Sequence, residues 1–247
     1  MQERVATLAQ AIEDGATAVA FTGAGVSTPS GVPDFRSDGG LWERYDPSVF
    51  TRSGFDADPA GFWRTWRDIA DEVGLDDVEP NAAHGALADM VERGALDAVL
   101  TQNADALHQD AGTPDDAVLE LHGSTRRAVC GDCGGRRPTD DLALDDPPPR
   151  CPDCGGTMEP DVVLFGDQLP EHALLRAQAL AEDSDVFLVA GSSLTVEPAA
   201  GLPRTAADRG ATLAVVNRDP TPLDDRADHV FHEDVVDVLP ALRDATT

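Results

Sequence analysis

Four cysteines are the first candidates for chemistry in this sequence. Cys130, Cys133, Cys151 and Cys154 form the pattern C-x2-C-x17-C-x2-C, and each pair is followed by two glycines. Two close pairs at this separation are typical of a tetrahedral zinc site. Two disulfides are the alternative, but no signal peptide is recognisable, so a reducing compartment is expected. Four thiolates leave no position open for water, and the pattern therefore predicts one structural zinc ion.

A glycine-containing turn is the second candidate. Gly23, Ala24, Gly25 and Ser27 follow a short apolar run. Glycines at such a place let the backbone turn tightly and bring its amides close to a pyrophosphate. Alone the motif is weak, because many similar turns bind nothing. The chain also does not continue with the second strand and acidic residue of an ordinary dinucleotide-binding unit, so a standard dehydrogenase is not expected.

Polar side chains follow several later apolar runs. Gln102, Asn103 and Asp105 come directly after one of them, and an amide and a carboxylate together can hold a carboxamide. His122 ends the next run and is either a general base or a hydrogen-bonded loop histidine. Asn217 ends a late run and is either a ribose contact or a turn residue. The sequence thus predicts a polar cleft at one edge of a sheet.

The elements that must position these residues alternate along the chain. Buried strands are predicted at 17–22, 98–101, 118–121, 186–190, 213–216 and 229–231. Amphipathic helices are predicted at 3–13, 83–93, 171–182, 198–209 and 234–243, and His84, at the start of the second, is expected to be structural. This alternation predicts an α/β fold with a parallel sheet covered by helices on both faces. Residues 37–80, rich in aromatics, and 125–160, with the cysteines, interrupt it and are expected to form a smaller domain.

The charge excludes several classes of partner. The chain has 247 residues and a formal net charge of −28, from 46 Asp and Glu against 18 basic residues, all of them Arg. Binding of nucleic acid or anionic membranes through general electrostatics is therefore not expected, and no run is long enough to span a bilayer. A monomeric cytoplasmic protein is expected. The Lys-free acidic surface predicts that the protein functions in concentrated salt, because salt screens the repulsion among its negative charges.

The ordered coincidence of these motifs resembles the sirtuins, which are NAD-dependent protein-lysine deacylases. The resemblance covers about residues 3–243. It rests on the segments Gly23–Ser27, Gly31–Arg36, Thr101–Asp105, His122–Gly123, Val162–Gly166 and Gly191–Leu194, together with the two cysteine pairs. Each motif is modest alone, whereas their order and spacing are specific.

The resemblance implies a domain organisation and a set of site residues. A Rossmann-like domain (1–36, 81–124 and 161–247) would bind NAD, and a helical insertion (37–80) and a zinc module (125–160) would form the small domain. The implied NAD contacts are Gly23, Ala24, Gly25, Ser27, Asp34, Phe35, Arg36, Gln102, Asn103, Asp105, Gly191, Ser192, Ser193, Asn217 and Val235. His122 would be the catalytic base, with Asn103 and Asp105 beside it. The implied peptide contacts are Val163, Phe165, Gly166, Leu194 and Val196.

The implied activity is transfer of an acetyl group from a lysine side chain to ADP-ribose, with release of nicotinamide. Acetylated proteins or peptides would be the partners. Two alternatives stay open: an NAD-dependent mono-ADP-ribosyltransferase, and a non-enzymatic NAD- or zinc-binding scaffold. The set Gln102, Asn103, Asp105 and His122 argues against the scaffold.

Some positions depart from the family pattern. Ala104 replaces a common Ile, Ser192 a usual Thr and Asp167 a usual Glu, and Glu159 stands where a basic residue is frequent. Family members that remove acidic acyl groups resemble one another in a Tyr and an Arg three apart in the helical insertion. This chain has Trp66 and Ile69 there, so acetyl or another neutral acyl group is predicted.

Overall fold

The larger part of the molecule is built on a six-stranded parallel sheet. The computed structural model describes residues 1–34, 40–74 and 77–246. The strand order is β3-β2-β1-β7-β8-β9 and every pairing is parallel. The strands are β1 (Ala18–Thr22), β2 (Ala98–Thr101), β3 (Val118–Glu120), β7 (Val186–Ala190), β8 (Thr212–Val216) and β9 (His229–Phe231). This order, reversing beside the first strand, is that of a Rossmann-like sheet.

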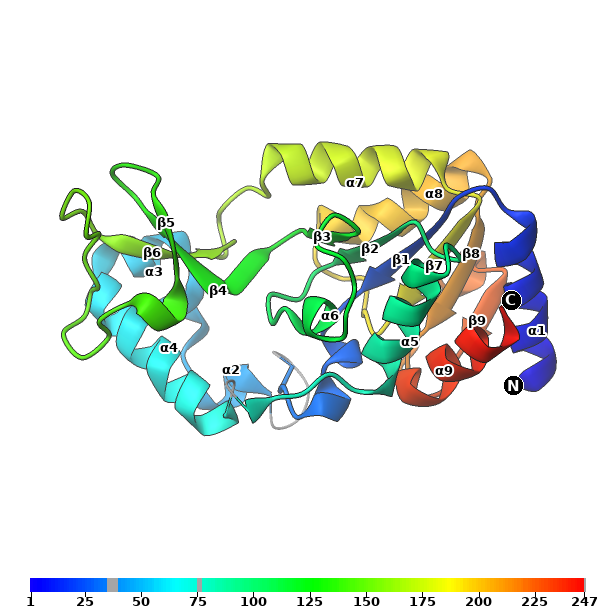
Figure 1. Cartoon of the computed structure of the whole chain (residues 1–247), viewed down its shortest axis with the longest axis horizontal. Coiled ribbons are helices and arrows are strands. Elements are labelled where there is room, and N and C mark those ends of the chain that lie inside the picture. The colour runs from blue at the N-terminus through cyan, green and yellow to red at the C-terminus, as the bar shows by residue number, and fades with distance from the viewer. Residues whose placement is uncertain (35–39, 75–76, 247) are drawn as a thin grey trace.

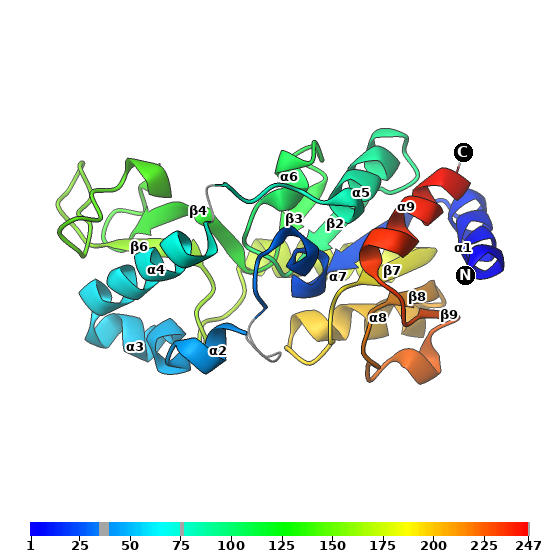
Figure 2. The same ribbon diagram turned by 90° about the horizontal axis from the view of Figure 1, so that it is seen from below.

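Helices cover both faces of the sheet, as the apolar runs predict (Figures 1 and 2). The helices α1 (Gln2–Asp14), α5 (Ala82–Glu92) and α9 (Val235–Ala245) pack on one face, and α7 (Glu171–Asp183) and α8 (Leu202–Arg209) on the other. In β1, Ala18 and Ala20 belong to the first core, whereas Val19 and Phe21 belong to the second. Successive side chains of a strand point to opposite faces, so a strand between two helical layers is apolar throughout.

The predicted elements lie close to the observed ones. All six strands are found where the apolar runs place them. The helix predicted from residue 198 differs: Ala199–Gly201 is a 3-10 turn, and α8 begins only at Leu202. Pro203 explains this boundary, since a proline fits the first turn of an α-helix but not its interior.

A smaller module holds the four cysteines and the aromatic insertion (left in Figure 1). Its sheet has the order β5-β4-β6, with β4 (Gly123–Cys130), β5 (Arg136–Pro138) and β6 (Met158–Val162) antiparallel. The helices α3 (Arg52–Ala57) and α4 (Pro59–Val73) lie against it. The short helix α2 (Leu41–Arg44) precedes them in the chain, and a one-turn helix α6 (Leu107–Asp110) follows β2. One apolar core joins α3 and α4 to the sheet, and Trp63 Nε1 donates to Met158 O (2.9 Å).

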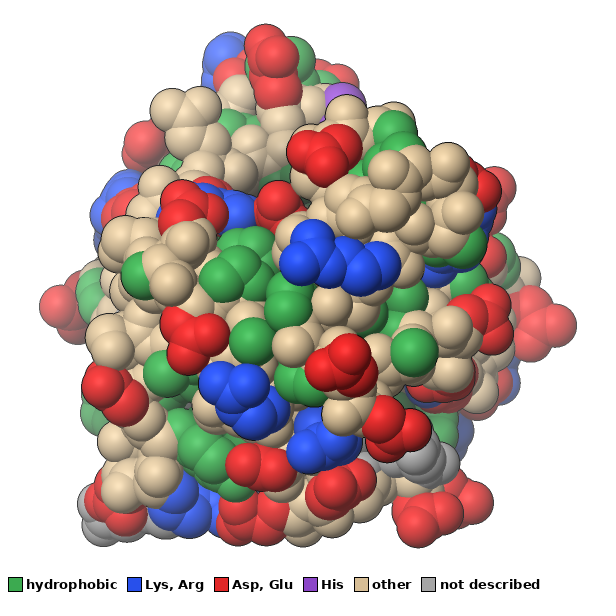
Figure 3. Space-filling view, turned by 90° about the vertical axis from the view of Figure 1, so that its left-hand side faces the viewer, with side chains coloured by type: hydrophobic (Ala, Val, Ile, Leu, Met, Phe, Trp, Pro, Cys, Tyr) green, Lys and Arg blue, Asp and Glu red, His purple; other side chains and the backbone are tan. Residues whose placement is uncertain are grey.

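The surface mixes carboxylates with arginines. Figure 3 faces the smaller module and shows Asp and Glu side chains scattered over it, with Arg side chains among them. Within the described part of the chain, no helix combines the length and apolar character needed to cross a membrane.

Candidate active site

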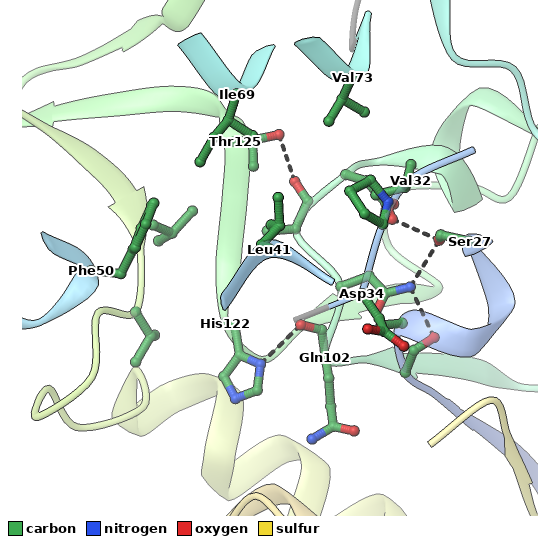
Figure 4. Close-up of a pocket in the computed structure, with 18 of the residues that line it drawn as sticks. Ser27, Val32, Asp34, Leu41, Phe50, Ile69, Val73, Gln102, His122 and Thr125 are labelled. Carbon is green, nitrogen blue, oxygen red and sulfur yellow. Dashed lines mark hydrogen bonds between the residues drawn. The ribbon is translucent and has the colours of Figure 1, made fainter. Parts of the chain in front are cut away.

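The carboxyl ends of five parallel strands meet at one edge of the large sheet. The segments that follow β1, β2, β3, β7 and β8 all line a single cleft of about 1230 Å³. The strand order reverses between β1 and β7, and ligands of open α/β sheets bind at such a point. Apolar side chains of the smaller module form the opposite wall, among them Leu41, Phe50, Ile69 and Val73 (Figure 4).

The two glycine turns touch each other backbone to backbone at this reversal point. Gly25 N donates to Gly191 O (2.8 Å), and Gly23 N donates to Ala190 O (3.1 Å). A Cβ on Gly23 would lie 2.8 Å from Gly191 O, and one on Gly191 would lie 2.4 Å from Val26 N. Gly191 also has a φ of +62°, which favours glycine. A side chain at either position would therefore clash with the opposite turn and force the two turns apart.

Asp105 is held in a fixed orientation by its neighbours. Ser27 Oγ donates to Asp105 Oδ2 (2.7 Å), and Leu107 N donates to Oδ1 (3.0 Å). Asn103 Nδ2 in turn donates to Ser27 Oγ (3.0 Å) and to Gly23 O (3.1 Å). The predicted glycine turn and the predicted polar strand end are thus one hydrogen-bonded unit (Figure 4).

His122 has one ring nitrogen bound and the other available. Its Nδ1 lies 2.9 Å from Gln102 O, and a carbonyl oxygen can only accept, so Nδ1 carries the proton (Figure 4). The neutral ring therefore has its lone pair on Nε2, the nitrogen that a general base needs. Burial lowers the pKa of His122 below its ordinary value, and the hydrogen bond to Gln102 O opposes this. The ring is consequently neutral at pH 7.

Two further histidines, His84 and His108, pack together behind the site, and the sequence predicts a structural role for His84 alone. His84 Nδ1 accepts from Asn81 N (3.3 Å), and its Nε2 lies 3.4 Å from Ser27 Oγ. The His108 ring is 5.0 Å from that of His84, and burial lowers the pKa of His84 to about 4 and that of His108 to about 3. The helix position of His84 gave no signal of its contact with Ser27, because that contact depends on how α5 packs.

The remaining predicted nucleotide contacts are spread along the cleft. Ser192 Oγ donates to Gln102 Oε1 (2.8 Å), which joins the ends of β7 and β2. Ala24, Asp34, Ser193, Asn217 and Val235 also line the cleft. The Asn217 side chain donates to Asp219 O (2.8 Å), so it has the turn contact that was the alternative interpretation, at a position that still borders the cleft. Phe35 and Arg36 lie outside the described residues.

The predicted peptide contacts divide into two groups. Val163, Phe165, Gly166 and Val196 line the cleft. Leu194 does not: its side chain is buried in the apolar core beneath α7 and α8. Its φ of +55° turns the backbone there, so that the side chain points away from the cleft.

The four cysteine sulfurs form one compact cluster. All four lie within 4.8 Å of one another; Cys130 and Cys154 are 3.5 Å apart, and Cys133 and Cys151 are 3.8 Å apart. A tetrahedral zinc ion with Zn–S bonds of about 2.3 Å requires sulfurs about 3.8 Å apart. The thiols are not joined in disulfides. The donor set therefore fits one structural zinc ion.

Comparisons with known proteins agree with this geometry. The model of the Sir2 family matches residues 23–198. A Haloarcula marismortui protein named NAD-dependent protein deacetylase is 54% identical, over 97% of this chain and 94% of its own length. A Streptomyces coelicolor protein named NAD-dependent protein deacetylase 2 is 47% identical, over 90% of this chain and 94% of its own length.

Solved structures give the same result. A structure described as Sir2 bound to acetylated peptide has a TM-score of 0.87 at 35% identity, with 96% of each chain covered. A structure from a study of the mechanism and regulation of Sir2 enzymes has a TM-score of 0.88 at 40% identity, covering 99% of this chain and 98% of the other. The chain belongs to the Sir2 family, the sirtuins.

Proposed function

We propose that this protein is an NAD-dependent protein-lysine deacetylase that transfers the acetyl group to ADP-ribose and releases nicotinamide. The observation that carries the proposal is the His122 ring, whose Nδ1 is held by Gln102 O and whose Nε2 is the available base. It borders the same cleft as the glycine turns and the Val163–Gly166 segment. Relatives named NAD-dependent protein deacetylases support the assignment.

NAD would supply the bond between nicotinamide and ribose, whose cleavage leaves a carbon that accepts the acyl oxygen. The chain's residues bind and orient around that chemistry. Gly23, Gly25 and Gly191 would shape the two turns that face the phosphates, since their own amides already donate to backbone carbonyls, and Asp105, oriented by Ser27, would bond the nicotinamide carboxamide. His122 Nε2 would take a proton from a ribose hydroxyl.

We assign the other predicted residues to the same reaction. Ser192, Ser193, Asn217 and Val235 would hold the adenosine half along the cleft, with Ala24, Asp34, Phe35 and Arg36 covering the other half. Val163, Phe165, Gly166 and Val196 would clamp an extended peptide as an added strand. For Leu194 only the backbone is proposed to take part.

The acyl group is proposed to be acetyl or another neutral group. Trp66 and Ile69 both line the cleft, so no cation stands at these two positions. The adjacent Arg67 also borders the cleft, and its Nη1 donates to Leu144 O (3.1 Å) in the zinc module.

We further propose that the helical insertion and the zinc module work together as a small domain in a monomeric, cytoplasmic protein of salty surroundings. Their shared apolar core supports the first point. Within the described residues, the exposed large apolar side chains are Met1, Phe165 and Leu175. They lie on three separate segments, which supports the proposal of a monomer. The net charge of −28 supports the proposal that the protein works in concentrated salt, and it disfavours nucleic acid as a partner.

A nicotinamide-release assay with an acetylated peptide tests the function. The wild type should release nicotinamide only when the acetylated peptide is present, and His122→Ala should abolish the release. His172→Ala, an exposed histidine on α7, is the matched control and should keep full activity. Peptide-independent release that survives His122→Ala would indicate a transferase, and no release at all would indicate a scaffold. Succinyl-lysine cleaved as fast as acetyl-lysine would contradict the neutral preference.

A further inference from the structure

The turn over residues 163–167, here called the clamp turn, is held by backbone bonds on both sides. Val163 N donates to His122 O (2.9 Å) on the side of the large sheet. On the other side Phe165 N donates to Phe50 O (2.9 Å), and Arg52 N donates to Phe165 O (2.9 Å). The clamp turn therefore spans the gap between the catalytic histidine and the helical insertion.

The side chain of Arg52 adds a second connection to the same turn. Its Nε and Nη2 donate to the two oxygens of Asp167, each at 3.0 Å, and its Nη1 donates to Glu159 Oε2 at 2.8 Å. One guanidinium thus binds both carboxylates, one of them through the parallel two-bond geometry that only arginine offers. The three side chains are 33%, 23% and 25% exposed, so solvent screens them less than an ordinary surface pair.

Asp167 uses the same carboxylate to close the clamp turn. Leu164 N donates to Asp167 Oδ2 (3.2 Å), and Asp167 N donates to Leu164 O (2.9 Å). Gly166, with a φ of +98°, lies between them. Because Arg52 holds the carboxylate that caps the turn, it restricts the conformation of a segment that otherwise contains a flexible glycine and a half-exposed Phe165.

We propose that Arg52 is a positioning residue for substrate: through Asp167 it keeps the clamp turn in the shape that binds the acetylated peptide. This rests on the proposed function, since it assigns the clamp turn to peptide binding. Arg52 itself does not line the cleft. The segments proposed to bind NAD follow β1, β2 and β7. Loss of Arg52 should therefore weaken binding of the acetylated peptide and leave NAD binding unchanged.

Steady-state kinetics on Arg52→Met, Arg52→Lys and Asp167→Asn test the proposal. Arg52→Met should raise the peptide KM about ten-fold, with kcat and the NAD KM near those of the wild type, because a two-bond charge-assisted contact is lost. Arg52→Lys keeps the positive charge but cannot make the two parallel bonds, so its peptide KM should lie between those of the wild type and Arg52→Met. The double variant Arg52→Met with Asp167→Asn should be no worse than Arg52→Met for peptide KM, since Arg52→Met already breaks the contact between Arg52 and Asp167. Arg64→Met, an exposed ion-pair arginine on α4, is the matched control.

Hydrogen exchange gives a readout that does not depend on activity. The amides of Arg52 and Phe165 should exchange faster in Arg52→Met than in Arg64→Met, at equal melting temperature. An unchanged peptide KM with unchanged exchange would overturn the proposal, as would an equal loss in kcat, NAD KM and stability, which would indicate a general folding role. If the wild type itself released no nicotinamide, the proposed function would fail, while the exchange of these amides would still decide whether Arg52 holds the turn.

Discussion

Replacement of Gly191 by alanine tests whether the contact between the two glycine turns controls NAD binding. Gly191 has a φ of +62°, and its new Cβ would lie 2.4 Å from Val26 N and 2.6 Å from Gly25 C. The left-handed conformation costs an alanine about 1–2 kcal/mol. Ordinary contacts begin near 3.5 Å, so the Gly25 turn must move by about 1 Å, and such overpacking costs about 1–3 kcal/mol. The free energy of unfolding should therefore fall by about 2–5 kcal/mol.

Gly94→Ala is the matched control, because it separates backbone strain from contact. Gly94 has a φ of +74°, and its Cβ would meet nothing within 4 Å. This variant should lose only the conformational part, about 1–2 kcal/mol, and should keep normal activity. In Gly191→Ala the displaced turn should also lower kcat/KM for NAD by about 10²-fold, the usual effect of a shift of about 1 Å at a reacting centre.

Urea unfolding without NAD and initial rates at varied NAD measure the two effects separately. If Gly191→Ala were as stable as Gly94→Ala, or kept the wild-type kcat/KM for NAD, the contact between the turns would not have the role described above.

Three further outcomes follow from the structure. Burial lowers the pKa of His122, so its neutral, proton-accepting form persists below pH 6.5. We therefore expect kcat/KM to fall only when the pH is lowered well below 6.5, and a fall that begins above pH 6.5 would contradict this. A strong chelator should remove zinc and unfold the smaller module, seen as a red shift of the tryptophan emission, because the buried Trp63 indole is bonded to that sheet. An unchanged spectrum after proven zinc loss would argue against a structural ion. The free energy of unfolding should rise with KCl because 28 net negative charges repel one another, and stability indifferent to salt would refute the interpretation of the acidic surface.

The ion pairs of Arg52 with Asp167 and Glu159 connect two departures from the family pattern. Asp167 and Glu159 look like isolated changes in the sequence, and Arg52 carries no motif. In the fold the Arg52 guanidinium donates to both carboxylates, although Arg52 and Asp167 are 115 residues apart. Ala104, which replaces a common Ile, is not part of these ion pairs. It borders the cleft, and its carbonyl accepts from Thr125 N (2.8 Å).

The local pattern was sufficient for the six strands of the large sheet and for the metal site. Strands buried on both faces are continuous apolar runs, and such runs can be recognised without knowing their neighbours. The paired cysteines needed only their spacing, because each C-x2-C pair lies on one turn and the second pair follows within reach. The polar residues after β2 and β3 could be assigned to one cleft because the carboxyl ends of parallel strands meet at one edge.

Only the tertiary structure decided which groups interact across that cleft. The Nδ1 proton of His122 depends on the carbonyl of Gln102, and the orientation of Asp105 depends on Ser27. His84 reaches Ser27 because of where α5 packs, and the Leu194 side chain enters the core because of a backbone turn. These contacts join segments far apart in the chain, and their distances depend on how helices and loops pack. The residue types along the sequence carry the chemistry, whereas the packing selects the partner of each side chain.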